Sequence, residues 1–423
     1  MKITEIQKCR VCGNPKLVTI MDLGEQPLSG KFPPKDKEDP PSAPLRLVKC
    51  DDSTDPDACG LVQLKHSCEP DTMYCNGYGY LSGMNQTMCA HLKDVTDKIQ
   101  EKAKLQEGDI VVDIGSNDGT LLKSYTTKRL FRVGIDPGGE QYAQYYPEDI
   151  NLITDFFPSN KFKHQYQDQK AKVITSIAMF YDLEDPLKFA QNIKDNLAQD
   201  GIWVLEQSYL PIMLKNNAFD TICHEHLEYY ALKQIEYILN LCNLKVIDVE
   251  TNNINGGSFK VYATHKDTLY PVNWSSVMAL RKSESEMKMG TPTPYLAFAN
   301  RVNTQKEKTL KFIKSELKQG KKFYVYGAST KGNVLINYYG LTNKEIVAAA
   351  DRNPEKWTCK MPGSHIPIIS EEDARAQNPD YFIALPWHFR SEFTSRESKF
   401  LNTGGKLLFP LPEFDIVGKD GSQ

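Results

Sequence analysis

Segment 110–122 combines residue types and spacing that suit ligand binding. An apolar, β-branched run ends at Asp113, and Gly115 and Gly119 then enclose a short polar turn before apolar residues return. This pattern predicts a strand, a tight loop and the start of a helix, and glycine lets backbone N–H groups approach a bound molecule. A second apolar run ends at Asp136, about where a carboxylate would meet ribose hydroxyls.

The loop differs from the dinucleotide fingerprint, which needs three glycines in G-x-G-x-x-G spacing to admit a pyrophosphate. Here the order is Gly-Ser-Asn-Asp-Gly, with Asn117 at the middle position and Asp118 after it. We therefore expect an adenosine-containing ligand without a pyrophosphate. The alternative is an ordinary strand-to-helix turn, and Asp136 argues against it.

Four N-terminal cysteines have spacing that suits a metal. Cys9-x-x-Cys12 has zinc-knuckle spacing, and Cys50 with Cys59 could complete a tetrahedral site of thiolates. We expect the surrounding unit to be small and irregular, with little core. Such a unit usually needs a cross-link such as a bound metal to be stable. Free cysteines without a metal are the alternative.

Composition narrows the class of protein. A chain of 423 residues predicts two or three domains, and a net charge of −3 gives no sign of a nucleic-acid or membrane partner. Apolar runs are too short for a membrane span, and the first residues lack the apolar core of a signal peptide. We therefore expect a cytoplasmic protein whose ten cysteines are thiols, ligands or core residues.

Three domains are expected: 1–75, 76–265 and 266–423. In the second, alternating strands and helices predict an α/β fold with a parallel, doubly wound sheet. Its expected strands are 110–114, 131–135, 172–177, 201–206, 244–250 and 258–263. Ligands bind at the carboxyl ends of such strands. Those ends carry Asp113, Asp136, the segment 176–181 and Glu206.

The third domain should begin with a connecting helix over 295–318 and continue as a second α/β unit. Strand 323–326, the glycine loop 327–332 and strand 346–351, with another strand at 381–385, predict Rossmann-like architecture. The loop lacks a complete dinucleotide fingerprint.

Several separated motifs, in this order along the chain, carry a resemblance to a known family. They are Cys9-x-x-Cys12, Asp22-Leu-Gly-Glu-Gln-Pro-Leu28, Tyr78-Gly-Tyr-Leu-Ser-Gly83, the first glycine loop, His224-Glu-His-Leu227, Asn255-Gly-Gly-Ser258, Tyr326-Gly-Ala-Ser-Thr-Lys-Gly332 and Pro386-Trp-His388. The chain resembles the class I S-adenosylmethionine methyltransferases. More narrowly, it is similar to the zinc-binding sugar C-methyltransferases of deoxysugar biosynthesis, which act on nucleotide-linked 4-keto-6-deoxy sugars.

The resemblance implies S-adenosylmethionine and zinc as cofactors and a nucleotide-diphosphate sugar as substrate. The residues expected at the cofactor are Asp113, Gly115, Asn117, Asp118 and Asp136, with Asp155 and Phe156 against adenine. Those expected at the substrate are Ser329 and Lys331 at the diphosphate, and Asn255 and Gly257 near the sugar. In the family the second cysteine pair is normally C-x-x-C, so the C-x8-C spacing here indicates an insertion and makes Cys68 a spare ligand.

Methylating a carbon requires a carbanion equivalent, and a C–H beside a ketone is acidic enough for a positioned base to remove. The resemblance places His226 as that base, with Glu225 orienting it. An imidazole suits this task near neutral pH. The family often has a tyrosine where this chain has Cys223, a weaker hydrogen-bond donor. Tyr78 and Tyr80 could replace its phenol, although aromatic packing would also account for them.

Two other functions remain open. The chain could methylate oxygen or nitrogen of a sugar or small metabolite, which needs no carbon acid. It could also be a zinc-stabilised scaffold whose cofactor fold is vestigial, although the intact Asp113, Gly115, Asp136 and His226 argue against this. We expect a monomer or weak dimer.

Overall fold

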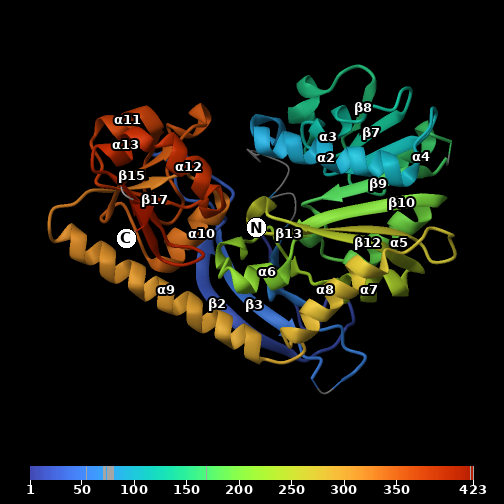
Figure 1. Cartoon of the computed structure of the whole chain (residues 1–423), viewed down its shortest axis with the longest axis horizontal. Coiled ribbons are helices and arrows are strands. Elements are labelled where there is room, and N and C mark those ends of the chain that lie inside the picture. The colour runs from blue at the N-terminus through green and yellow to red at the C-terminus, as the bar shows by residue number, and fades with distance from the viewer. Residues whose placement is uncertain (54, 70–72, 74–80, 168, 420, 423) are drawn as a thin grey trace.

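The computed structural model describes residues 1–423 except 54, 70–72, 74–80, 168, 420 and 423. Tyr78 and Tyr80, two candidate catalytic residues, lie outside the described residues. Figure 1 shows the central seven-stranded sheet on the right, the C-terminal sheet on the left and strands β2 (Leu17–Pro27) and β3 (Ser42–Cys50) between them. The long helix α9 (Thr293–Leu317) runs along one side of the molecule.

The N-terminal unit is more regular than the sequence suggests. It forms a four-stranded sheet in the order β11-β4-β3-β2, and its pairs are antiparallel. The other strands are β1 (Ile3–Glu5), β4 (Val62–Leu64), β5 (His66–Cys68) and β11 (Glu228–Tyr229). The expectation of an irregular unit is wrong because residues 43, 45 and 47 of β3 alternate with more exposed neighbours and bury one face of the sheet.

The central seven-stranded sheet has the order β12-β13-β10-β9-β6-β7-β8. Its strands are β6 (Ile110–Ile114), β7 (Phe131–Ile135), β8 (Ile150–Ile153), β9 (Ala171–Ile177), β10 (Leu197–Ser208), β12 (Leu244–Asn252) and β13 (Ser258–His265). Its helices are α2 (Gln86–Ala103), α3 (Thr120–Lys123), α4 (Asn160–Gln165), α5 (Pro186–Asn196), α6 (Leu210–Lys215) and α7 (Leu232–Leu241). Each expected strand is confirmed, because each has a short β-rich run bounded by turn residues.

The central sheet is mixed rather than fully parallel. Strand β13 pairs antiparallel with both β10 and β12, whereas β6, β7, β8, β9 and β10 pair in parallel. Only residues 253–257 connect β12 to β13, which is too short for the crossover that a parallel pair requires. The expectation of a parallel sheet is corrected at this edge.

The C-terminal sheet has the order β16-β15-β14-β17-β18-β19-β20. Its strands are β14 (Phe323–Tyr326), β15 (Ile346–Asp351), β16 (Ile368–Ser370), β17 (Tyr381–Ala384), β18 (Lys406–Phe409), β19 (Asp415–Gly418) and β20 (Gly421–Ser422). The remaining helices are α8 (Trp274–Glu286), α10 (Thr330–Tyr339), α11 (Glu371–Ala376), α12 (Arg390–Arg396) and α13 (Ser398–Asn402). The expected strands and the long helix are confirmed.

One apolar core connects the units. It runs from the C-terminal sheet through α9 and α10 to the inner face of β2 and β3 and to α6 of the central unit. The position of each unit therefore depends on burial shared with its neighbours. Among the helices of the described segments, none is both long enough and apolar enough for a bilayer crossing.

Candidate functional site

A cavity of about 880 Å³ lies where the three units meet. Its wall includes Gly115 and His226 from the central unit, Lys331 and His388 from the C-terminal unit, and Phe32 from the N-terminal unit. Residues far apart in the sequence therefore face one cavity, with the size of a typical ligand pocket.

Both seven-stranded sheets present a topological switch point to this cavity. In the central sheet, β6 lies between β7 and β9, and the loop after β6 and the residues after β9 line the cavity. In the C-terminal sheet, β14 lies between β15 and β17, and the loops after β14 and β17 line it. Open α/β sheets bind ligands at such points, so the cavity joins two candidate ligand sites.

The first glycine loop has the backbone shape that the sequence predicts. Gly115 has φ +70° and Gly119 φ +72°, the left-handed region that glycine adopts without strain. Asp113 is buried and its Oδ1 accepts a 2.6 Å hydrogen bond from the Thr175 hydroxyl. Burial raises the pKa of the Asp113 carboxyl to about 7. Gly115, Asp113 and Asn117 line the cavity.

The acidic residues near this loop hold it in place. The two Asp136 oxygens accept hydrogen bonds from the Asn117 N–H (2.9 Å) and the Gly138 N–H (2.8 Å). Asp118 accepts the Gly83 N–H at 2.8 Å and so attaches the chain preceding α2 to the loop. Neither acid is among the residues that line the cavity, and their contact with the cofactor stays a prediction.

The segment with the two histidines is fixed from both sides by its backbone. The Leu227 N–H donates to the Tyr181 carbonyl at 2.8 Å, and the Leu227 carbonyl accepts the Leu64 N–H at 2.8 Å. Strand β11 begins at the next residue and pairs with β4 of the N-terminal sheet. The segment therefore bridges the central and N-terminal units.

His226 presents one ring nitrogen as a base. Its Nδ1 lies 2.9 Å from the Thr221 carbonyl, which can only accept, so Nδ1 carries the proton and Nε2 keeps its lone pair. The Tyr181 ring packs against the imidazole at 4.3 Å between centroids. Burial and the nearby Lys331 ammonium lower the pKa of His226 to about 3. The imidazole is therefore neutral near pH 7.

The neighbours of His226 point in different directions. Glu225 and Cys223 line the cavity beside it, and burial raises the pKa of the Cys223 thiol. His224 turns away, since its Nε2 lies 3.1 Å from the Ala43 carbonyl of β3. The structure thus brings Glu225 and His226 to one wall, as the resemblance implies.

The second glycine loop contacts the loop between β12 and β13. The Lys331 ammonium donates to the Asn255 carbonyl at 3.0 Å, and the Ser329 hydroxyl caps α10 by accepting the Gly332 N–H at 3.0 Å. All three of Lys331, Asn255 and Ser329 line the cavity. Gly257 is not among the lining residues. A Cβ there would lie 2.1 Å from Ile212 and φ is +126°, so packing and backbone conformation explain this glycine.

Asp155 and Phe156 lie outside the residues that line the cavity. Asp155 accepts the Ser159 hydroxyl at 2.8 Å and the Phe156 N–H at 2.9 Å, while half of the Phe156 side chain is exposed. Their contact with adenine stays a prediction.

The four predicted cysteines form one cluster. The sulfurs of Cys9, Cys12, Cys50 and Cys59 all lie within 4.8 Å of one another, and Cys68 is not among them. Tetrahedral zinc with bonds of about 2.3 Å needs sulfurs separated by roughly 3.8 Å. The shortest sulfur separations, 3.5 Å, are close to this value, so the cluster fits zinc. Four sulfur ligands leave no open position for substrate.

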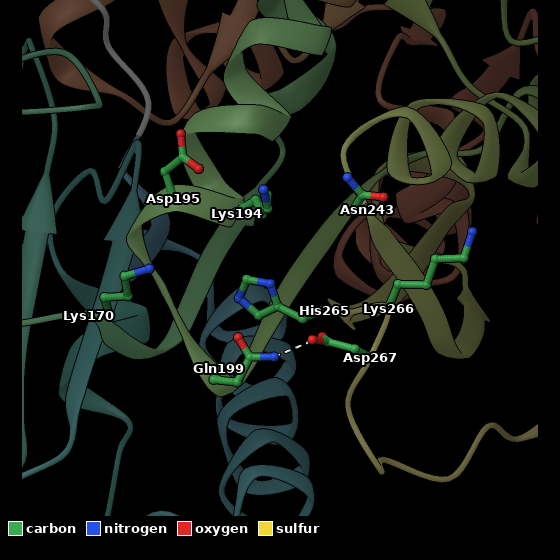
Figure 2. Close-up of a pocket in the computed structure, with 8 residues that line it drawn as sticks. All are labelled: Lys170, Lys194, Asp195, Gln199, Asn243, His265, Lys266 and Asp267. Carbon is green, nitrogen blue, oxygen red and sulfur yellow. Dashed lines mark hydrogen bonds between the residues drawn. The ribbon is translucent and has the colours of Figure 1, made fainter.

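A second, more open depression of about 520 Å³ lies at the other edge of the central sheet (Figure 2). Its wall mixes three lysines with two aspartates, and the Gln199 amide donates to Asp267 at 2.8 Å. Lys170 precedes β9 and Gln199 lies near the start of β10, so the depression is at the amino ends of these strands. Open α/β sheets bind ligands at the opposite edge, and we place no chemistry here.

Sequence reasoning missed several residues of the cavity wall. His91 on α2, Gln207 after the predicted end of β10, and Asp220 before the histidine segment all line it. Asp220 accepts the Trp387 indole N–H at 3.1 Å and so joins the central unit to the Pro-Trp-His motif. Nothing in the sequence around His91 or Asp220 indicates that these residues line the cavity. Gln207 could have been found, because it follows Glu206, which was expected at a strand end.

Comparisons with known proteins agree with this architecture. Three family models match in succession: "Putative zinc binding domain" over residues 9–74, "Methyltransferase domain" over 83–249 and "C-methyltransferase C-terminal domain" over 253–412. "C-methyltransferase NovU" from Streptomyces niveus is 29% identical over 424 residues, covering 99% of each chain.

Solved structures show weaker similarity. A S-adenosylmethionine-dependent methyltransferase from Clostridium acetobutylicum is 12% identical, with TM-score 0.32, covering 42% of this chain and 91% of that one. The plantazolicin methyltransferase BpumL, solved with SAH, is 15% identical, with TM-score 0.32, covering 46% and 77%. These scores are too low to support a functional conclusion.

Replacing Cys59 with serine should remove bound zinc and lower the melting temperature, because one of four thiolates is lost and the small unit depends on its metal. Elemental analysis and thermal unfolding measure both effects. Cys68→Ser is the matched control and should keep about one zinc per chain. A Cys59→Ser protein with full zinc content would exclude this thiol as a ligand.

Replacing Asp136 with alanine should weaken S-adenosylmethionine binding by about 1.5–3 kcal/mol, the typical worth of a hydrogen bond to a charged group. Titration calorimetry measures the dissociation constant. Asp149→Ala, at the residue before β8, is the control because its exposed carboxylate pairs with Arg132 at the amino end of β7. Equal affinities of the Asp136→Ala and unmodified proteins would show that Asp136 has no energetic role in binding.

Proposed function

We propose that this S-adenosylmethionine-dependent methyltransferase transfers its methyl group to a carbon of a nucleotide-linked 4-keto-6-deoxy sugar, as the match to a C-methyltransferase domain and the similarity to a C-methyltransferase support. The observation that carries this proposal is the single cavity that spans two switch points, with His226 in its wall. One switch point suits the cofactor and the other a second nucleotide. The sugar would then lie between them, beside the imidazole.

On this proposal the nucleotide diphosphate binds at the second glycine loop. The Lys331 ammonium supplies a positive charge, and the N-terminus of α10 offers backbone N–H groups that favour an anion. Ser329 shapes this end of the helix by capping it. Asn255, held by Lys331 through its carbonyl, would lie on the sugar side.

His226 would then act as the general base. Its Nε2 accepts the proton from the carbon beside the ketone, and the C–H electron pair forms the enolate. The enolate carbon bonds to the methyl group, whose bond to sulfur breaks. Bound S-adenosylmethionine supplies that electrophilic methyl. Glu225, adjacent in the cavity wall, would orient the sugar or the imidazole.

The proposal assigns a task to each expected domain. Residues 1–75 hold the histidine segment through β4, residues 76–265 bind the cofactor and carry the base, and residues 266–423 bind the nucleotide. Methylation of oxygen or nitrogen is the competing reaction, and it requires no removal of a carbon-bound proton.

Incubation with a nucleoside diphosphate 4-keto-6-deoxyhexose in deuterium oxide should place deuterium at the carbon beside the ketone. His226→Gln should abolish this exchange and lower turnover by about 10²–10⁴-fold, while both ligands still bind. Mass spectrometry follows the exchange, and calorimetry follows binding. His224→Gln is the matched control and should be much milder, because His224 faces the Ala43 carbonyl rather than the cavity.

Methylation without any exchange, in a protein that binds the sugar nucleotide, would favour the oxygen or nitrogen reaction. Exchange that persists in His226→Gln would instead move the base to another residue.

The pH dependence of kcat/KM should not show the loss of activity near pH 6.5 that a histidine base of ordinary pKa would cause. A general base must be unprotonated, so activity is lost as pH falls through its pKa, here about 3 in the free protein. We expect no inflection of kcat/KM near pH 6.5 on the acid side, because kcat/KM reports the free enzyme. Lys331→Met should shift the acid-side loss of activity to a higher pH, because it removes one of the two causes that lower the pKa of His226. An inflection near 6.5 in the unmodified protein would contradict this electrostatic account.

A further inference from the structure

The cavity wall carries a second lysine that has no part in the reaction described above. Lys356 ends the 3-10 turn Pro354–Lys356, which follows the carboxyl end of β15. Its Nζ donates to the Ala328 carbonyl at 2.9 Å and lies 4.3 Å from the centre of the Phe32 ring. Both Lys356 and Phe32 line the cavity. The ammonium group therefore lies between the second glycine loop and an aromatic ring of the N-terminal unit.

Backbone hydrogen bonds hold the ring and the lysine in place together. The Lys360 N–H donates to the Pro33 carbonyl at 2.9 Å, and the Lys35 N–H donates to the Thr358 carbonyl at 3.1 Å. The two bonded segments directly follow the ring and the lysine in the sequence. One wall of the cavity is therefore built jointly by the N-terminal and C-terminal units.

The charge of Lys356 is not balanced inside the protein. Within the part of the chain that the structure describes, Lys356 forms no ion pair. Asp351 at the end of β15 uses its two oxygens to accept the Ala328 N–H at 2.9 Å and the Asn353 N–H at 2.8 Å. Glu355 also lines the cavity, but it is exposed to solvent. Burial lowers the pKa of Lys356. A half-buried ammonium without a counter-ion is costly, which indicates that an anionic ligand pairs with it.

Two lysines flank the N-terminus of α10. Ala328, whose carbonyl binds Lys356, directly precedes Ser329, the residue that caps this helix. Lys331 lies in the first turn of the helix, and its ammonium contacts the Asn255 carbonyl of the central unit. One ammonium group thus faces the N-terminal unit and the other faces the central unit. A ligand with two linked phosphates could pair with both charges at an end of a helix that favours anions.

The two lysines differ in their relation to the candidate base. Lys331 lies near enough to His226 to lower the pKa of the imidazole, whereas Lys356 has no such effect. Lys356 lies instead beside Phe32, at the wall shared with the N-terminal unit. The reacting sugar must lie beside His226. The phosphate that carries the sugar therefore belongs at Lys331, and the phosphate that carries the nucleoside belongs at Lys356.

We infer that Lys356 binds the nucleoside-side phosphate of the acceptor and that Phe32 packs against its nucleoside, while Lys331 binds the sugar-side phosphate. This inference rests on the proposed function, since it needs a sugar nucleotide in the cavity. It gives the acceptor one orientation, with the nucleoside toward the N-terminal unit and the sugar toward the central sheet. It also gives the N-terminal unit a direct part in substrate recognition.

The test compares four ligands by calorimetry: S-adenosylmethionine, a nucleoside monophosphate, the diphosphate and its 4-keto-6-deoxyhexose, with thymidine, uridine, guanosine and cytidine forms screened first. Lys356→Met should weaken all three nucleotides by at least about tenfold and leave S-adenosylmethionine unchanged. Lys331→Met should weaken the diphosphate and the sugar nucleotide similarly, but change the monophosphate by less than about threefold, because its single phosphate lies at the other lysine.

Lys306→Met is the matched control. Lys306 on α9 also lies over an aromatic ring, at 4.0 Å from the centre of Tyr338, and burial lowers its pKa, but it does not line the cavity. This variant should bind all four ligands normally.

Phe32→Leu supplies a second measurement that changes no charge and does not depend on the folding of Lys356→Met. It should weaken all three nucleotides by at least about fivefold, the effect of losing one stacking contact. Binding of inorganic pyrophosphate, which lacks a nucleoside, should stay unchanged in Phe32→Leu and weaken in Lys356→Met.

The outcomes separate the two proposals. If no nucleotide binds the unmodified protein, the proposed function fails and this inference fails with it. If the nucleotides bind but neither Lys356→Met nor Phe32→Leu weakens them, the proposed function stands and the nucleoside site is wrong. If Lys331→Met weakens the monophosphate and Lys356→Met does not, the acceptor has the opposite orientation. A loss confined to S-adenosylmethionine would assign Lys356 to the cofactor and would also overturn the inference.

Discussion

The site depends on one constraint, the pair of backbone hydrogen bonds made by Leu227. One attaches the histidine segment to Tyr181, in the turn that follows β9, and the other attaches it to Leu64 on β4. Strand β4 begins three residues after Cys59, so the thiol cluster fixes the strand that positions His226. A metal unit without an open ligand position thereby contributes to the placement of the candidate base.

The same placement sets the electrostatics of that base. Burial and Lys331 keep His226 neutral by lowering its pKa, which makes it available but weakly basic in the free protein. On the proposed arrangement, a diphosphate bound at Lys331 offsets the ammonium charge and raises the basicity of the imidazole. Proton removal would then become easier when the acceptor is present, which couples substrate binding to reactivity.

Local sequence signals predicted the glycine loops and most central strands of the two large sheets, because these depend on neighbouring residues. They missed the shorter outer strands β8, β16, β18 and β19. The run before Asp113 and the loop at Gly115 have the expected backbone. Contacts between distant segments could not be read in this way. The pairing of β11 with β4, the bond from His91 to Glu206 and the core shared by the units all join residues far apart in the chain. The antiparallel edge of the central sheet results from the short connection between β12 and β13, and the apolar pattern of a strand does not indicate the direction in which it pairs.

The shared core also explains how the chain accommodates Cys223. Burial and the neighbouring Glu225 carboxylate raise the pKa of this thiol, so it stays protonated where it lines the cavity. The wall beside His226 nevertheless carries an aromatic side chain, Tyr181, which lies in the 3-10 turn Phe180–Asp182 after β9 and packs on the imidazole. Because the backbone of Tyr181 is hydrogen-bonded to Leu227, any shift of the turn after β9 would move the ring and the histidine together. The geometry of the wall is thus maintained by the sheet rather than by one residue of the histidine segment.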